Sequence, residues 1–153
     1  MSTLDDVIGE TTGRAHAVLD YSRTMSRLVK SAKAPEFSAQ SWGPLADLVA
    51  VDDFVRIGPF KEVMNWPEYV EFLTGWAKSS EWDCSFKRIS EAGDVVFLEL
   101  EEHSRIGDFS SVVNSASVYE FNAEGKITYI AVYLQMQLPD SAPMPSFDAG
   151  QAE

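Results

Sequence analysis

The chain has 153 residues and a formal net charge of −12, from 12 basic and 24 acidic side chains. Hydrophobic residues make up 45% of it, which is enough to bury one core in one domain. The negative charge argues against nucleic acid and anionic membranes as partners, because both are bound mainly through positive charge. No apolar run approaches the roughly 20 residues that a membrane span needs.

The first residues of the chain and its cysteine content both indicate the cellular compartment in which the protein is found. The opening stretch MSTLDDVIGE is acidic and lacks the apolar core of a secretion signal. Cys84 is the only cysteine, which excludes an internal disulfide and suits a reducing compartment. We therefore expect a cytoplasmic protein in which Cys84 is a small buried hydrophobe rather than a nucleophile.

The first half of the chain is mainly helical by pattern. Apolar residues recur at helical spacing over 4–32, with glycines that break the start of this helix. A second short helix is predicted over 41–49, and a strand over 52–58 ends at a Gly-Pro pair. Asn65-Trp66-Pro67-Glu68 resembles a capping box that opens a third helix, which continues to about Ser79.

The second half reads as strands joined by tight turns. We predict strands over 82–90, 95–106, 111–121 and 127–137, paired as an antiparallel meander. Helices followed by such a meander make an α+β domain, with the helices across one face of a curved sheet. We assign 1–137 to this domain and 138–153 to an extended tail.

Three stretches carry a resemblance to a known family. Val51-Asp52-Asp53-Phe54-Val55, the Gly-Pro after it, and YEFNAEGKI at 119–127 resemble the nuclear transport factor two-like superfamily. That superfamily includes ketosteroid isomerase, SnoaL-like polyketide cyclases, scytalone dehydratase and limonene epoxide hydrolase. The resemblance spans roughly residues 14–137. It implies a curved antiparallel sheet wrapped around the N-terminal helices, cone-shaped with an internal cavity.

The catalytic positions of these relatives are not preserved. Gly58 stands where ketosteroid isomerase has its catalytic aspartate, and the second aspartate of that enzyme falls at or next to Ser117. Val132 stands where limonene epoxide hydrolase has an aspartate on its last strand. The resemblance therefore implies a cavity but does not transfer either mechanism intact.

The long strand 95–106 has two faces, and the apolar pattern and the family resemblance disagree on which of them is buried. Alternation places Val96, Leu98 and Leu100 on one face, and the apolar pattern predicts that this face is buried. The resemblance instead turns the other face, with Glu99, Glu101 and His103, toward the cavity. A bulge near Glu101-Glu102 would reconcile the two. The alternative is that Glu99 to Arg105 form a solvated, ion-paired outer stripe.

With the second orientation, two carboxylates and an imidazole would divide acid and base roles. We predict Glu101 and His103 as the proton-transfer pair, with Tyr21 and Arg56 stabilising a developing oxyanion. The other predicted substrate contacts come from strands and helix: Phe97, Glu99, Asn114, Ser117, Tyr69, Trp76, Val132 and Leu134. The sequence holds two distant histidines and no strong ligand spacing, so we predict neither a metal nor a cofactor.

We predict a cofactor-independent lyase or isomerase that acts on a hydrophobic, aromatic small molecule. Dehydration, a double-bond shift, and retro-aldol loss of a small aldehyde such as formaldehyde all fit the predicted groups. The alternatives are a non-catalytic ligand-binding or dimeric interaction domain and, less favoured, an epoxide hydrolase. We expect a homodimer through the outer sheet face, with an interface of Val96, Leu98, Leu100, Tyr129, Ala131 and Tyr133.

Overall fold

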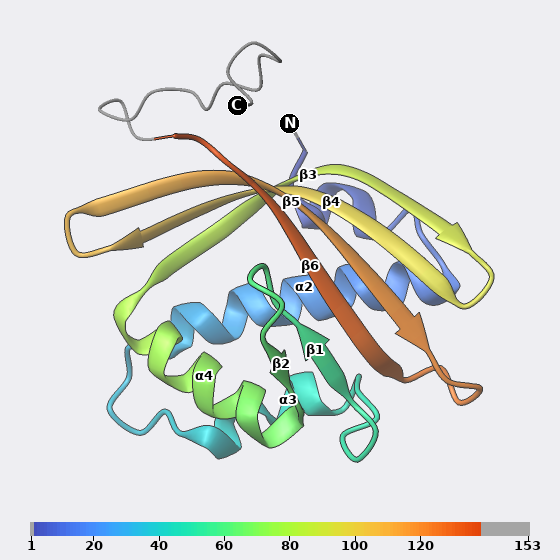
Figure 1. Ribbon diagram of the computed structural model, residues 1–153, viewed down its shortest axis with the longest axis horizontal. Coiled ribbons are helices and arrows are strands. Elements are labelled where there is room, and N and C mark those ends of the chain that lie inside the picture. The colour runs from blue at the N-terminus through green and yellow to red at the C-terminus, as the bar shows by residue number, and fades with distance from the viewer. Residues whose placement is uncertain (1, 139–153) are drawn as a thin grey trace, which may run out of the picture.

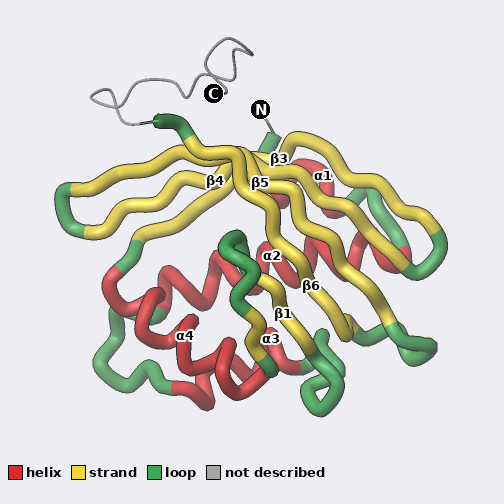
Figure 2. Tube along the Cα trace, in the orientation of Figure 1, coloured by secondary structure: helices red, strands yellow, loops and turns green. Residues whose placement is uncertain are grey.

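The computed structural model describes residues 2–138, in which helices pack against one face of a curved sheet (Figures 1 and 2). The α+β class and the cone-like wrapping of the sheet around the helices are confirmed. The tail predicted over 138–153 lies outside the described residues except for Leu138. No helix within 2–138 is both long enough and apolar enough to cross a membrane.

Local sequence signals placed α4 well, whereas the helix predicted over 41–49 is a 3-10 turn followed by one short α-helical turn. The predicted break divides the first helical region into α1 (Leu4–Ile8) and α2 (Gly13–Ser31). A 3-10 turn (Ala39–Trp42) leads into α3 (Gly43–Ala46), and α4 covers Trp66–Ser79. The capping box of α4 is confirmed, because the Asn65 side chain accepts from the Glu68 amide at 3.0 Å and Glu68 accepts from the Asn65 amide at 2.9 Å.

The sheet has six strands in the order β2-β1-β6-β5-β4-β3. The strands are β1 (Val55–Ile57), β2 (Val63–Met64), β3 (Glu81–Ala92), β4 (Val95–Ile106), β5 (Phe109–Phe121) and β6 (Ile127–Met136). Strands β3 to β6 form the predicted antiparallel meander. One pair departs from the antiparallel pattern that we expected, because β1 runs parallel to β6. A long connection through α4 and strands β3 to β5 separates β1 from β6 in the sequence, and this allows β6 to lie beside β1 and run in the same direction.

The core lies between α2 and the concave face of the sheet. Val18, Leu19 and Val29 of α2 are fully buried, as are Val96 and Leu98 of β4 at no more than 1% exposure. This face of β4 is the apolar one that alternation predicted to be inside. Burial of its aliphatic side chains against the helix supplies the main driving force for this orientation.

The register of β4 against β5 has no bulge. Pairs run without interruption from Val95↔Glu120 to Ile106↔Phe109, so Glu102 faces the same side as Leu98 and Leu100. The register shifts lie elsewhere, between Phe86 and Arg88 on β3 and between Glu120 and Phe121 on β5. No bulge therefore lies at Glu101-Glu102 to reconcile the two orientations.

Candidate active site

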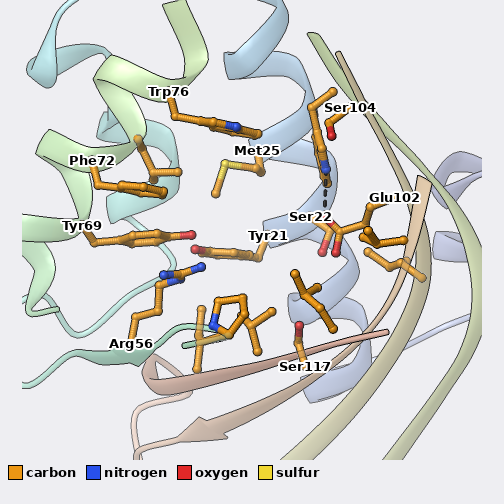
Figure 3. Close-up of a pocket in the computed structure, with 18 of the residues that line it drawn as sticks. Tyr21, Ser22, Met25, Arg56, Tyr69, Phe72, Trp76, Glu102, Ser104 and Ser117 are labelled. Carbon is orange, nitrogen blue, oxygen red and sulfur yellow. Dashed lines mark hydrogen bonds between the residues drawn. The ribbon is translucent and has the colours of Figure 1, made fainter. Parts of the chain in front are cut away.

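A cavity of about 330 Å³ opens between α2, α4 and the concave face of the sheet (Figure 3). This volume is within the range of small-molecule sites. Its walls are mostly apolar, with Met25, Phe72, Leu100 and Val132 among the lining side chains. A small set of polar side chains interrupts them: Tyr21, Ser22, Arg56, Tyr69, Glu102, Ser104, Ser111, Ser117 and Tyr119.

Glu102 supplies the one carboxylate among the described residues that line the cavity. Its place on β4 turns the side chain toward the helices (Figure 3). The indole N–H of Trp82 on β3 donates to Glu102 Oε1 at 2.8 Å. Trp82 is in turn fixed by an edge-to-face contact with Trp76 of α4, at 6.3 Å between centroids. Two tryptophans therefore hold the direction of this carboxylate.

The opposite wall carries two tyrosine hydroxyls and a guanidinium. Tyr21 comes from α2, Tyr69 from α4 and Arg56 from β1, and Figure 3 shows their polar ends converging. Tyr21 and Tyr69 are almost fully buried, at 3% and 7% exposure. Within residues 2–138 the Tyr21 hydroxyl has no hydrogen bond of good geometry, although the Tyr69 hydroxyl faces it. The Tyr21 hydroxyl is shielded from solvent, so it acts together with Tyr69 as one pair of hydroxyls at the cavity wall.

Burial keeps these tyrosines protonated. Loss of hydration raises the pKa of Tyr21 well above its ordinary value of 10.0, and the nearby Tyr69 and Tyr119 raise it further. Burial also raises the pKa of Tyr69, although the neighbouring Arg56 partly offsets the rise. Both side chains are therefore neutral O–H groups at neutral pH, able to donate to an acceptor oxygen.

The Arg56 guanidinium lies close to two aromatic rings. It lies 4.9 Å from the ring centroid of Tyr69 and 5.8 Å from that of Phe72. The nearest carboxylate is Glu62 in the β1–β2 hairpin, with 4.0 Å between Arg56 Nη1 and Glu62 Oε2. That distance is an ion pair but is too long for a hydrogen bond.

Four of the predicted site residues lie on the outer face of the sheet instead. Glu99, Glu101 and His103 do not line the cavity, and the prediction that they face it is wrong. Glu99 accepts from Arg88 at 3.0 Å, and Glu101 Oε1 lies 2.9 Å from His103 Nε2. Phe97, at 45% exposure, lies on the same outer face. The outer ion-paired stripe that we kept as the alternative is what the structure shows.

A fifth predicted residue, Asn114, is also outside the cavity. Its side chain donates to Gln135 at 3.0 Å across the β5–β6 pair, opposite Glu101. The physical reason is common to all five. The aliphatic side chains of β4 drive one face inward, and the continuous register of β5 then fixes the parity of every neighbouring residue.

The remaining predicted residues do line the cavity. They are Tyr21, Arg56, Tyr69, Trp76, Ser117, Val132 and Leu134. The sequence reasoning missed Glu102, Trp82 and Ser104 as lining residues. The alternation of side chains along β4 already placed Glu102 on the same face as Leu98 and Leu100, and so indicated that it points inward. The family resemblance indicated the opposite face, and we followed the resemblance.

Glu62 was also missed, and its carboxylate lies against Gly58 at the end of β1. A Cβ on Gly58 would lie 2.2 Å from Glu62 Oε2, so the Glu62 carboxylate occupies the space that a side chain there would need. Glu62 also accepts from the Phe60 amide at 2.9 Å. The hairpin thus brings a carboxylate from a later position to the end of β1.

Two other predictions concern Cys84 and the dimer. Cys84 is half-buried, and burial together with the nearby Glu102 raises the pKa of its thiol to about 12, which fits an inert side chain. The predicted interface combines residues of opposite faces, because Leu98 is buried under α2 whereas Tyr133 is 62% exposed on the outside. A homodimer through the outer face stays a prediction, with Phe97, Val112 and Tyr133 as its exposed apolar residues.

Within the part of the chain that the structure describes, no three His, Cys, Asp or Glu side chains meet as they would around a metal ion. Comparison with protein-family models gives no match, and no curated protein matches the sequence.

Solved structures do match. A SnoaL-like polyketide cyclase from Shewanella denitrificans superposes with a TM-score of 0.65 at 12% identity, over 80% of this chain and 90% of that one. An LEH-like epoxide hydrolase of M. tuberculosis gives 0.64 at 17% identity, over 82% and 85%. A ketosteroid isomerase-like protein from Kribbella flavida gives 0.60 at 15% identity, over 92% and 87%.

At sequence identities this low, a structural match shows that the fold is shared but does not identify the reaction. The element order, the curved sheet over α2 and the cavity between them agree with that set of neighbours. This chain has the nuclear transport factor two-like fold, shared with SnoaL-like and ketosteroid isomerase-like proteins.

Proposed function

We propose that the protein is a cofactor-independent lyase or isomerase for a hydrophobic small molecule, with its acid–base chemistry in the cone cavity. One observation carries the proposal. A carboxylate, Glu102, lies on one wall of a mostly apolar cavity, and the paired hydroxyls of Tyr21 and Tyr69 lie on the opposite side beside Arg56. In this proposal Glu102 takes the proton-transfer role that we had assigned to Glu101 and His103.

The arrangement suits a reaction that develops charge on oxygen. Glu102 removes a proton, and the electron pair moves toward an oxygen of the substrate. Tyr21 then donates a hydrogen bond to that oxygen, with Tyr69 and Arg56 beside it. Fixed donors in a site with little water stabilise such a charge more than water does, because they need not reorganise during the reaction.

Three reaction types need only this equipment. A double-bond shift and a dehydration begin with proton removal next to a carbonyl. A retro-aldol cleavage begins at a hydroxyl, and its carbon–carbon bond breaks to leave an enolate. Solved neighbours described as a cyclase, a ketosteroid isomerase and an epoxide hydrolase support small-molecule chemistry in general. They do not favour one of the three reactions.

The second candidate is a non-catalytic ligand-binding protein. A computationally designed binder of 17-OHP has the same fold, with a TM-score of 0.61 at 19% identity over 80% of this chain and 92% of that one. That neighbour illustrates a cavity of this fold that was designed for binding. A binding protein needs no particular carboxylate, so the role of Glu102 separates the two candidates.

The test uses two simple proton-transfer substrates, nitrobenzisoxazole and a β,γ-unsaturated cyclic ketone. Each gives a chromophore when a base removes one carbon-bound proton. We expect Glu102→Gln to lower kcat/KM by about 100-fold to 10,000-fold, the usual contribution of a positioned general base. Tyr21→Phe should lower kcat more than it raises KM, because it removes a donor to the transition state.

Glu101→Gln is the matched control, because it makes the same chemical change one residue away on the outer face. It should leave the rate unchanged. Equal rates for Glu102→Gln, Glu101→Gln and the wild type would contradict the catalytic proposal and favour the binding protein.

A further inference from the structure

Trp82 is a cavity-lining residue whose only polar side-chain atom is engaged with Glu102. The indole N–H donates to Glu102 Oε1 at 2.8 Å, the dashed line in Figure 3. Both side chains line the cavity. A hydrogen bond to a carboxylate is roughly twice as strong as one between neutral groups, and this length is typical of it. The bond therefore restricts a glutamate side chain that would otherwise sample several rotamers.

The register of the sheet places this donor within reach of the carboxylate. β3 and β4 pair without a shift across this stretch, so that Cys84 lies opposite Glu102 and Trp82 lies opposite Ser104. Trp82 and Glu102 are therefore diagonal neighbours on the inner face, at a separation that aromatic and other long side chains span. Cys84, which is directly opposite, has a short side chain with only a weak donor. The tryptophan is thus the residue of β3 that fits this contact.

The position of Trp82 is fixed by its neighbours in the fold. Trp76 of α4 meets its ring edge to face, with 66° between the ring planes. Lys33, which follows α2, donates to the carbonyl of Ala77 at 2.6 Å and to that of Ser80. Ser80 is fully buried and lies two residues before Trp82. The junction between α4 and β3 is therefore tied to α2, and Trp82 enters the sheet from a fixed point.

We propose that Trp82 is the positioning residue of Glu102 in catalysis: its N–H holds Oε1, and Oε2 is the oxygen that takes the proton from the substrate. This role rests on the function proposed above, because it requires Glu102 to act as the base. A base works when it lies within hydrogen-bond reach of the proton that it removes. A carboxylate held by one oxygen keeps the other at a fixed place, which favours reaction in each encounter with the substrate.

The alternative role for Trp82 is packing alone, and Trp42 is an example of that role. The Trp42 indole N–H also donates a hydrogen bond, to Thr74 Oγ1 at 2.9 Å, but neither of these residues lines the cavity. Loss of the Trp42 N–H should affect the stability of the fold, whereas loss of the Trp82 N–H should affect the reaction. The two tryptophans therefore make a matched pair for an experiment.

The experiment removes the indole N–H without changing the shape of the ring. Benzothienylalanine, introduced by nonsense suppression, carries sulfur where tryptophan carries the N–H. With the proton-transfer substrates described above, Trp82→benzothienylalanine should lower kcat by about 10-fold to 100-fold, the cost of a misplaced catalytic group, and leave KM within about twofold. Trp42→benzothienylalanine is the control and should leave both constants unchanged.

A double variant separates positioning from any other contribution of Trp82. The Trp82 replacement should have no further effect in the Glu102→Gln background, because the base on which it acts is already absent. A further loss of similar size in that background would overturn the positioning role. An unchanged kcat in the Trp82 variant, together with a lowered kcat in Glu102→Gln, would overturn it as well. An unchanged rate in Glu102→Gln would instead overturn the proposed function, and the positioning role with it.

The hydrogen bond can also be measured without turnover. In a proton–nitrogen correlation spectrum, the Trp82 indole proton should resonate upfield in Glu102→Gln relative to the wild type, because a charged acceptor is lost. The Trp42 signal should not move, and Glu101→Gln on the outer face should leave both signals in place. An identical Trp82 signal in Glu102→Gln and the wild type would overturn the positioning role. This measurement decides alone if the Trp82 replacement does not fold.

Discussion

The two faces of β4 carry the same kinds of side chain in different surroundings. Glu101 and Glu102 are neighbours in sequence, yet Glu101 lies beside His103 on the outer face and Glu102 points into the cavity against Trp82. On the outside, water and ion pairing compensate the charge, so the glutamate has no evident chemical task. Inside, apolar walls and a fixed indole donor surround the second one. Whether a glutamate can take part in a reaction therefore depends on its position relative to the core more than on its residue type.

The difference between the two faces should affect stability most of all. Leu98 is 1% exposed on the inner face, and its neighbour Phe97 is 45% exposed on the outer face. Leu98→Ala should lower the free energy of unfolding by about 2–5 kcal/mol, because it leaves a cavity under α2. Phe97→Ala should change it by about 0.5 kcal/mol or less in the monomer. Guanidinium chloride titration measures both, and similar losses would contradict the assignment of the faces.

A second effect concerns pH. Burial raises the pKa of Tyr21, Tyr69 and Tyr119 in the folded state above the unfolded value of 10.0. Above that pH the unfolded chain loses protons that the folded chain keeps, so stability falls as pH rises. Each such tyrosine should contribute a loss of about 1.4 kcal/mol per pH unit. Urea titrations at increasing alkaline pH should therefore show a steep decline.

Tyr21→Phe provides the check on that slope, because it removes one of the three titrating groups. The decline with pH should become shallower in this variant. Tyr133→Phe, which changes a tyrosine that is 62% exposed on the outer face, serves as the control. A slope unchanged by Tyr21→Phe would show that this inner hydroxyl is not sequestered from water.

The smallest expected effect belongs to the outer ion pair. The hydrogen bond from Arg88 lowers the pKa of Glu99 below its ordinary value of 4.5. A depressed pKa in the folded state contributes stability above the unfolded pKa, and this contribution is lost as pH falls through the folded value. Glu99→Gln should therefore be slightly less stable than the wild type at neutral pH, with the difference vanishing in acid. Thermal unfolding at pH 7 and pH 3 tests this.

A constant difference between the wild type and Glu99→Gln at both pH values would mean that the substitution acts through packing rather than charge. Because the pair is exposed, high salt should also reduce the difference at neutral pH. Salt should have less influence on Glu102, which lies inside the cavity.

Local sequence signals were sufficient for most of the fold. Asn65 and Glu68 marked the start of α4, and Gly93 and Gly125 occupy the left-handed turns that join the strands of the meander. The limits predicted for 95–106 agree with those of β4. These features depend on contacts between residues close in sequence, or on the two-residue period of one strand, and a sequence displays both directly.

From sequence alone we could predict the α+β class, the limits of α4 and β4, and an apolar face on β4, whereas the limits of β1 differ and β2 was missed. The tertiary structure decided which polar side chains share the cavity, because that depends on register across strands and on helices far away in sequence. Tyr21, Arg56, Tyr69 and Glu102 come from four separate elements, and only packing brings them together. The burial of Leu98 and Leu100 turns Glu102 inward and Glu101 outward. For this reason the candidate carboxylate is Glu102 and not Glu101.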